Sequence, residues 1–245
     1  MAEGARPIPQ GYLEQSRDPL NSLVLCLPIL LVYELGLFVS RGDTLNGVDF
    51  ITVFLLRHWG TEGLLAFNAG LLLTCLIAVA ALRRGQRLHP QIVFPILLES
   101  AAYALLMGSV IVLVMQRVLH LAAAPPPPPS LSHRVFISLG AGFHEELVFR
   151  VGIFGGVLWS LRRLLPGGNK AAAFVVALVV SSTLFSLAHY AGAEQFQLRS
   201  FVFRLLAGAL LCGLFATRGF AVAVYTHTLY DIWVLILPDL MRRGG

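Results

Sequence analysis

Charged residues are scarce in this chain. Asp, Glu, Lys and Arg make up 13% of its 245 residues, whereas soluble domains carry about 25%. Hydrophobic residues take their place at 57%, and the mean hydropathy is +0.77. Because one bilayer span needs roughly 20 apolar residues, this composition excludes an ordinary soluble domain and predicts a polytopic membrane protein.

The chain has three cysteines, and no two of them form a CxxC pair. Cys26, Cys75 and Cys212 each lie within an apolar stretch, so we expect buried free thiols and not a cysteine metal or redox site. The net charge of +5 is spread over short loops without a long basic block. That pattern fits membrane topology, so the lipid bilayer is an expected partner and nucleic acid is not.

Apolar runs predict an all-α, polytopic transmembrane bundle of seven to eight spans. The predicted spans lie at roughly 20–40, 62–82, 92–123, 133–165, 171–190, 200–217 and 219–238. A shorter apolar stretch at 48–57 is an interfacial or re-entrant piece. The first apolar run does not follow the basic-then-apolar pattern of a cleavable signal peptide, so we expect it to remain as a span.

Glycine and proline divide the chain further. The segment 133–165 is too long for one span, and three glycines near Val151–Gly156 predict a span followed by a short helix. Two glycine pairs at close spacing, Gly152 with Gly156 and Gly208 with Gly213, predict close helix packing.

Five consecutive prolines, Pro125 to Pro129, cannot continue a helix. The expected organisation is an N-terminal polar segment at 1–19, N-terminal transmembrane helices at 20–124, a Pro-rich loop at 125–132 and a C-terminal transmembrane core at 133–240.

Ionisable side chains inside predicted spans are costly and therefore prompt functional hypotheses. The stretch GFHEELVFR, residues 142–150, holds two adjacent carboxylates. Glu146 and Arg150 are four residues apart, so on a helix they share one face as an ion pair. Glu145 is rotated by about 100° from Glu146, which gives the two carboxylates different surroundings. A solvated helix end is the alternative, but apolar residues surround the charges and continue beyond them.

Two later spans supply further polar groups. His189 lies in SSTLFSLAHYAG, and His227 and Asp231 lie four residues apart in YTHTLYDIW. Brought together in a bundle core, Glu145 can act as general base on a water molecule with His189 as its partner. His227 and Asp231 can then stabilise an oxyanion, the Asp only when protonated or acting through His227.

Several alternatives stay open at this point. Two histidines and a glutamate are also a catalytic zinc set, although HEELVFR is not HExxH, so a divalent metal is a lesser alternative to a site without cofactor. The same groups can serve a proton- or ion-coupled transporter, or remain in a non-catalytic scaffold or immunity protein. Glu34 and Glu99, both within spans, either line the same cavity or form hydrogen bonds between spans.

Three motifs resemble those of a known family. EELVFR fits E-E-x-x-x-R, FSLAH fits F-x-x-x-H and HTLYD fits H-x-x-x-D/N. In order and placement they resemble the CAAX protease and bacteriocin-processing family, the intramembrane glutamic endopeptidases also called Abi proteins. This family includes the eukaryotic prenyl-protein endoprotease. The resemblance covers roughly residues 133–240.

The resemblance implies an intramembrane catalytic cavity and an endopeptidase acting on a membrane-associated protein or peptide. It implies that Glu145 and His189 activate water, that His227 and Asp231 stabilise the oxyanion, and that Glu146 and Arg150 support them. A prenylated tail, a bacteriocin leader or a C-terminal sorting tail, the last cleaved by myxosortase-like members, are the candidate substrates. The Ala-, Pro- and Arg-rich composition favours a bacterial plasma membrane as the location.

Overall fold

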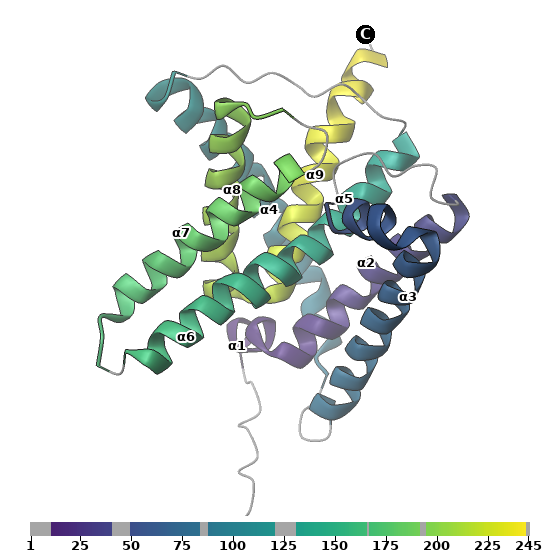
Figure 1. Cartoon of the computed structure of the whole chain (residues 1–245), viewed down its shortest axis with the longest axis horizontal. Helices are drawn as coiled ribbons and strands as arrows, with labels where there is room; N and C mark the ends of the chain where they lie inside the picture. Colours follow the sequence, from purple (N-terminus) through teal and green to yellow (C-terminus); the bar gives the residue numbers. More distant parts are fainter. Residues whose placement is uncertain are drawn as a thin grey trace, which may run out of the picture.

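The computed structural model describes residues 11–40, 50–83, 88–120, 131–165, 167–191 and 195–243, and over these residues the fold is all-helical (Figure 1). The α-helices are α1 (Tyr12–Arg17), α2 (Pro19–Ser40), α3 (Phe50–Arg83), α4 (Val93–Leu113), α5 (Leu131–Glu146), α6 (Gly156–Leu164), α7 (Lys170–Ala188), α8 (Leu198–Arg218) and α9 (Phe220–Arg243). Short 3-10 turns precede α4 and follow α7, and π-helical stretches follow α4 and α5. The predicted all-α class is confirmed. The proline run and the first ten residues lie outside the described residues.

Five of these helices are long and apolar enough to cross a membrane. The candidate spans are Pro19–Gly36, Phe54–Ala81, Pro90–Val118, Lys170–Ala188 and Leu198–Arg218. The segments predicted as spans at 133–165 and 219–238 are also helical but lie outside this set. We therefore treat the chain as an integral membrane protein, while the span number of seven to eight and the four-part division of the chain stay predictions.

Helix α9 occupies the middle of the bundle, with α2 and α3 on one side and α7 and α8 on the other (Figure 1). One buried apolar cluster joins α9 to α2, α3, α4 and α5, and a second joins it to α4 and α8. The three cysteines are free and buried in the described structure, as predicted. This central position brings the α9 side chains within reach of α5 and α7.

The sequence predicted a split near Val151–Gly156 and a separate apolar piece at 48–57, and both regions, the second from residue 50 on, are irregular but continuous helix. A π-helix, Leu147–Gly155, joins α5 to α6 where a split was predicted, so the long segment continues through a wider turn. The π geometry crowds one of its glycines, because a Cβ at Gly155 would lie 3.3 Å from the Arg150 carbonyl oxygen five residues earlier. In α3, the stretch before Gly60 is helical and joins the rest of the helix through a kink at that residue, where φ is 66°.

Glycines set two close approaches to α5 that the sequence did not reveal. A Cβ at Gly142 would lie 1.9 Å from Thr228 Oγ1 on α9, and one at Gly140 would lie 2.2 Å from the Tyr33 ring on α2. Among the predicted packing glycines, Gly208 does lie against Ser182 of α7. The prediction is wrong for Gly213 and for Gly156, where an added Cβ meets open space.

Candidate active site

Helix α5 and the π-helix after it bury four polar side chains between residues 144 and 150. Glu145, Glu146 and Arg150 are 1%, 0% and 0% exposed, and His144 is 2% exposed. This burial contradicts the alternative of a solvated helix end. Buried charges are tolerated only when they are paired, so their partners define the site.

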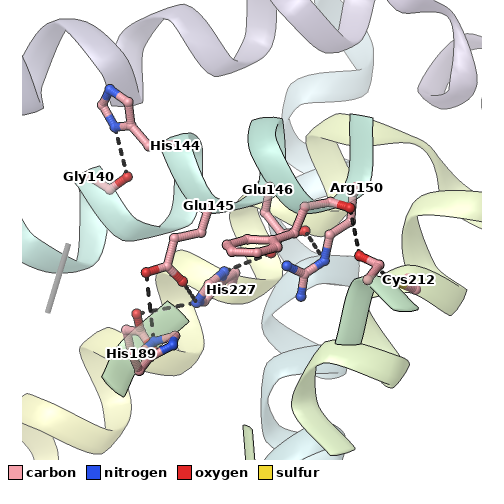
Figure 2. A network of polar contacts seen from close by, with 11 residues as sticks. Gly140, His144, Glu145, Glu146, Arg150, His189, Cys212 and His227 are labelled. Carbon is pink, nitrogen blue, oxygen red and sulfur yellow. Dashed lines mark hydrogen bonds and ion pairs between the residues drawn. The ribbon is translucent and has the colours of Figure 1, made fainter. Parts of the chain in front are cut away.

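Glu146 joins two elements of the site. Its Oε2 lies 3.1 Å from Arg150 Nε, which confirms the predicted ion pair. Its Oε1 accepts a hydrogen bond from His227 Nδ1 at 2.8 Å. One carboxylate therefore neutralises the buried guanidinium on its own helix and holds an imidazole on α9 (Figure 2).

Glu145 points away from that pair and toward two histidines (Figure 2). Its Oε1 lies 3.8 Å from His189 Nε2, and its Oε2 lies 3.8 Å from His227 Nε2. Both distances exceed those of a hydrogen bond, and catalytic contacts in an unliganded enzyme are often long in this way. The two adjacent carboxylates thus share His227 but differ in their other partner, which is Arg150 for Glu146 and His189 for Glu145.

The two imidazoles are held in different ways. His189 Nδ1 donates to the Phe185 carbonyl oxygen at 2.8 Å, so the neutral ring presents an unprotonated Nε2 to Glu145. His227 donates through Nδ1 to Glu146, and its Nε2 faces Glu145 and also Asp231 Oδ2 at 3.5 Å. An imidazole with carboxylates at both nitrogens donates at both only when protonated. The structure thus brings all six predicted site residues into one network.

One member of the network was not assigned a role from the sequence. The Phe185 ring is 3% exposed and lies under the Arg150 guanidinium, whose Cζ is 4.5 Å from the ring centroid. Its four-residue spacing from His189 placed both on one helix face, which was the available signal. Because the contact to Arg150 crosses between helices, the spacing alone did not reveal it.

His144 takes no part in this network. It lies on the opposite side of α5, where Nδ1 donates to the Gly140 carbonyl oxygen at 3.0 Å and the ring packs edge-on against Tyr33 (Figure 2). Its orientation agrees with its place outside the three motifs. His144 is turned by about 100° from Glu145 and by about twice that from Glu146, so its side chain leaves α5 away from both carboxylates.

Metal ligation was tested against the same geometry. In the part of the chain that the structure describes, no three His, Cys, Asp or Glu side chains meet in an arrangement that could hold a metal ion. A metal requirement is a matter for chelation experiments.

Part of the chain matches the model of a known protein family. Residues 127–233 match the family model described as Rce1-like, type II CAAX prenyl endopeptidase Rce1-like. No curated protein and no solved structure matches the chain significantly. The match supports no assignment to the narrower myxosortase-like group. It includes all three motifs and every one of the six site residues, from Glu145 to Asp231. Over these residues the chain is similar to the Rce1-like type II CAAX prenyl endopeptidase family, which is a family of proteases.

Proposed function

We propose that the protein is an intramembrane endopeptidase that cleaves a membrane-associated protein or peptide with water activated by Glu145 and His189. The observation that carries this proposal is the position of Glu145, a buried carboxylate that faces Nε2 of two histidines from two other helices. Activation of water needs a proton acceptor within reach of the water and a second group that orients it. Glu145 and His189 supply these within the segment that matches the protease family.

The reaction follows from the donor and acceptor atoms. Glu145 takes a proton from water while the unprotonated His189 Nε2 accepts the other hydrogen in a hydrogen bond. The water oxygen attacks the peptide carbonyl carbon, and the carbonyl π electrons move to its oxygen. Protonated His227 donates from Nε2 to that oxyanion. The C–N bond then breaks, and the leaving nitrogen takes the proton from Glu145.

The supporting residues hold His227 in this role. Asp231 lies 3.5 Å from His227 Nε2, so we propose that it acts on the oxyanion only through the imidazole. This role does not require its carboxyl group to be protonated. Glu146 fixes the other ring nitrogen at 2.8 Å, and Arg150 holds Glu146. Because no step of this scheme uses a metal ion, we expect activity to survive chelation.

The family description points to prenylated tails ending in a CAAX sequence as the first substrate class to test. Two quenched fluorescent peptides, identical except for a farnesyl group, would be incubated with the purified protein in detergent.

Parallel mass spectrometry of new protein termini would compare cells carrying the wild type with cells carrying Glu145→Gln, at the bacterial plasma membrane where we place the protein. Termini that depend on Glu145 would identify the substrate, and an identical set of termini in both cells would overturn the proposal.

A further inference from the structure

The Arg150 guanidinium is held by fewer contacts than its charge requires. It is fully buried, and in the described residues none of its nitrogens makes a hydrogen bond of good geometry. Its partners are the ion pair with Glu146 at 3.1 Å and the face of the Phe185 ring at 4.5 Å. An aromatic face attracts a cation most strongly when both are shielded from water. The ring is therefore the second partner of this charge.

The same ring lies against both histidines. Its centroid is 5.1 Å from that of His189 and 6.0 Å from that of His227, with interplanar angles of 75° and 73°. These are edge-to-face contacts, which favour one relative orientation of the rings. The Phe185 carbonyl oxygen in addition accepts the His189 Nδ1–H bond. One residue thus contacts the water-activating imidazole, the oxyanion-binding imidazole and the arginine that holds Glu146.

Phe185 is itself firmly placed. Its ring packs edge-on against Phe149, with centroids 5.3 Å apart, and an added Cβ at Gly208 would lie 3.2 Å from its Cδ1. One turn earlier, Ser181 Oγ donates to the Phe149 carbonyl oxygen at 2.6 Å. Helix α7 is therefore attached to the π-helix directly beside the ring.

We propose that Phe185 is a positioning residue whose ring couples Arg150 to both histidines and so sets the angle at which His189 and His227 face Glu145. It touches no reacting atom. Loss of the ring should leave substrate binding intact and disturb the imidazole geometry. The kinetic part of this inference rests on the proposed function, but the orientation of the rings does not.

The test compares Phe185→Leu with Phe185→Tyr and with a matched control, Phe154→Leu. Phe154 is equally buried, at 1% exposed, and packs edge-on against Phe174 and Phe215, away from the histidines. Protein labelled with ¹⁵N-histidine would be studied in detergent by long-range ¹H–¹⁵N NMR. His189→Gln and His227→Gln spectra would assign the two rings.

We expect Phe185→Leu to move the ring ¹⁵N signals of both histidines, while Phe154→Leu leaves them in place and Phe185→Tyr restores them. On the cleaved peptide, Phe185→Leu should lower kcat by about 10- to 100-fold, with KM changed less than about twofold and a shifted pH profile. Unchanged histidine signals in Phe185→Leu, or the same shifts in Phe154→Leu, would overturn the inference. Should the wild type cleave neither peptide, the NMR spectra decide about Phe185 independently of the proposed function.

Discussion

Two clusters of charge in this protein, a partly buried one around Glu99 and a buried one around Glu145, differ in the partners of their carboxylates. Glu99 on α4 contacts Arg218 of α8 through both oxygens, with the Nη2 contact at 2.7 Å, and also accepts a hydrogen bond from Tyr12 of α1. Glu145 has its two histidine nitrogens at 3.8 Å, beyond hydrogen-bonding distance. The first cluster joins three helices through short contacts, while the second brings three helices together through longer ones.

The difference separates a structural ion pair from the carboxylate that we propose as the general base. A carboxylate saturated by a bidentate arginine and a phenol has little capacity left for a proton or a substrate. Of the two uses that the sequence left open for Glu99, the contacts to Arg218 and Tyr12 favour bonding between helices. Glu145 instead faces two imidazoles, and an imidazole can give up or take a proton near neutral pH. The two carboxylates therefore differ in their partners as well as in their burial.

The largest effect should come from exchanging the two carboxylates for amides one at a time. We expect Glu145→Gln to lower peptide cleavage by about 10³-fold or more, because the general base is lost, with little change in thermal stability. Glu99→Gln should keep cleavage per folded molecule but lower stability by about 3 kcal/mol, since Arg218 is left without its charge partner. For both variants, cleavage is measured with the peptide substrate and stability by thermal unfolding in detergent. A Glu99→Gln protein that folds normally and does not cleave would break the comparison.

The contact between α5 and α9 gives the next effect. Gly142→Ala would place a Cβ 1.9 Å from Thr228 Oγ1 and 3.1 Å from the Thr228 backbone nitrogen. We expect a loss of about 1–3 kcal/mol in stability and a fall of about 10²-fold in cleavage, because Glu145 and Glu146 move away from His227.

Two companion variants sharpen this test. Thr228→Ala removes the nearest clashing atom, so adding it to Gly142→Ala should recover part of the cleavage and stability. Gly213→Ala adds a Cβ in open space on α8 and should leave cleavage unchanged. Wild-type activity in Gly142→Ala would mean that the two helices can separate without affecting the site.

The smallest effect concerns Tyr12, outside the candidate spans. Tyr12→Phe removes the hydrogen bond to Glu99 but keeps the ring beside Arg218, so we expect a loss of about 1–2 kcal/mol in stability and unchanged cleavage. Burial, followed by the bond to Glu99, raises the pKa of Tyr12 from 10.0 to about 12. The neutral phenol is thus favoured by folding, and this contribution is complete below pH 10 and lost as the pH rises through 12. Thermal unfolding across pH 9–12 should show this extra decline in the wild type and not in Tyr12→Phe.

Much of the site could be predicted because helical geometry is local. The four-residue spacing of Glu146 and Arg150 predicted their ion pair, and the 100° turn per residue predicted that Glu145 faces elsewhere. The spacing of His227 and Asp231 likewise predicted that the carboxylate lies beside the imidazole, which the 3.5 Å distance confirms. The hydrogen bond from His227 to Glu146 joins residues 81 positions apart and follows from no local pattern.

The sequence by itself determined the helical class, the apolar surfaces and the identity of the six polar groups, because hydrophobic periodicity and i,i+4 spacing act within one helix. Only the tertiary structure decided how these groups combine. The close approach at Gly142, the π-helix after Glu146 and the Phe185 ring between Arg150 and the histidines depend on how α5, α7 and α9 pack. Packing also separates Glu99 from Glu145, since whether a buried carboxylate meets an arginine or an imidazole depends on which helix lies beside it.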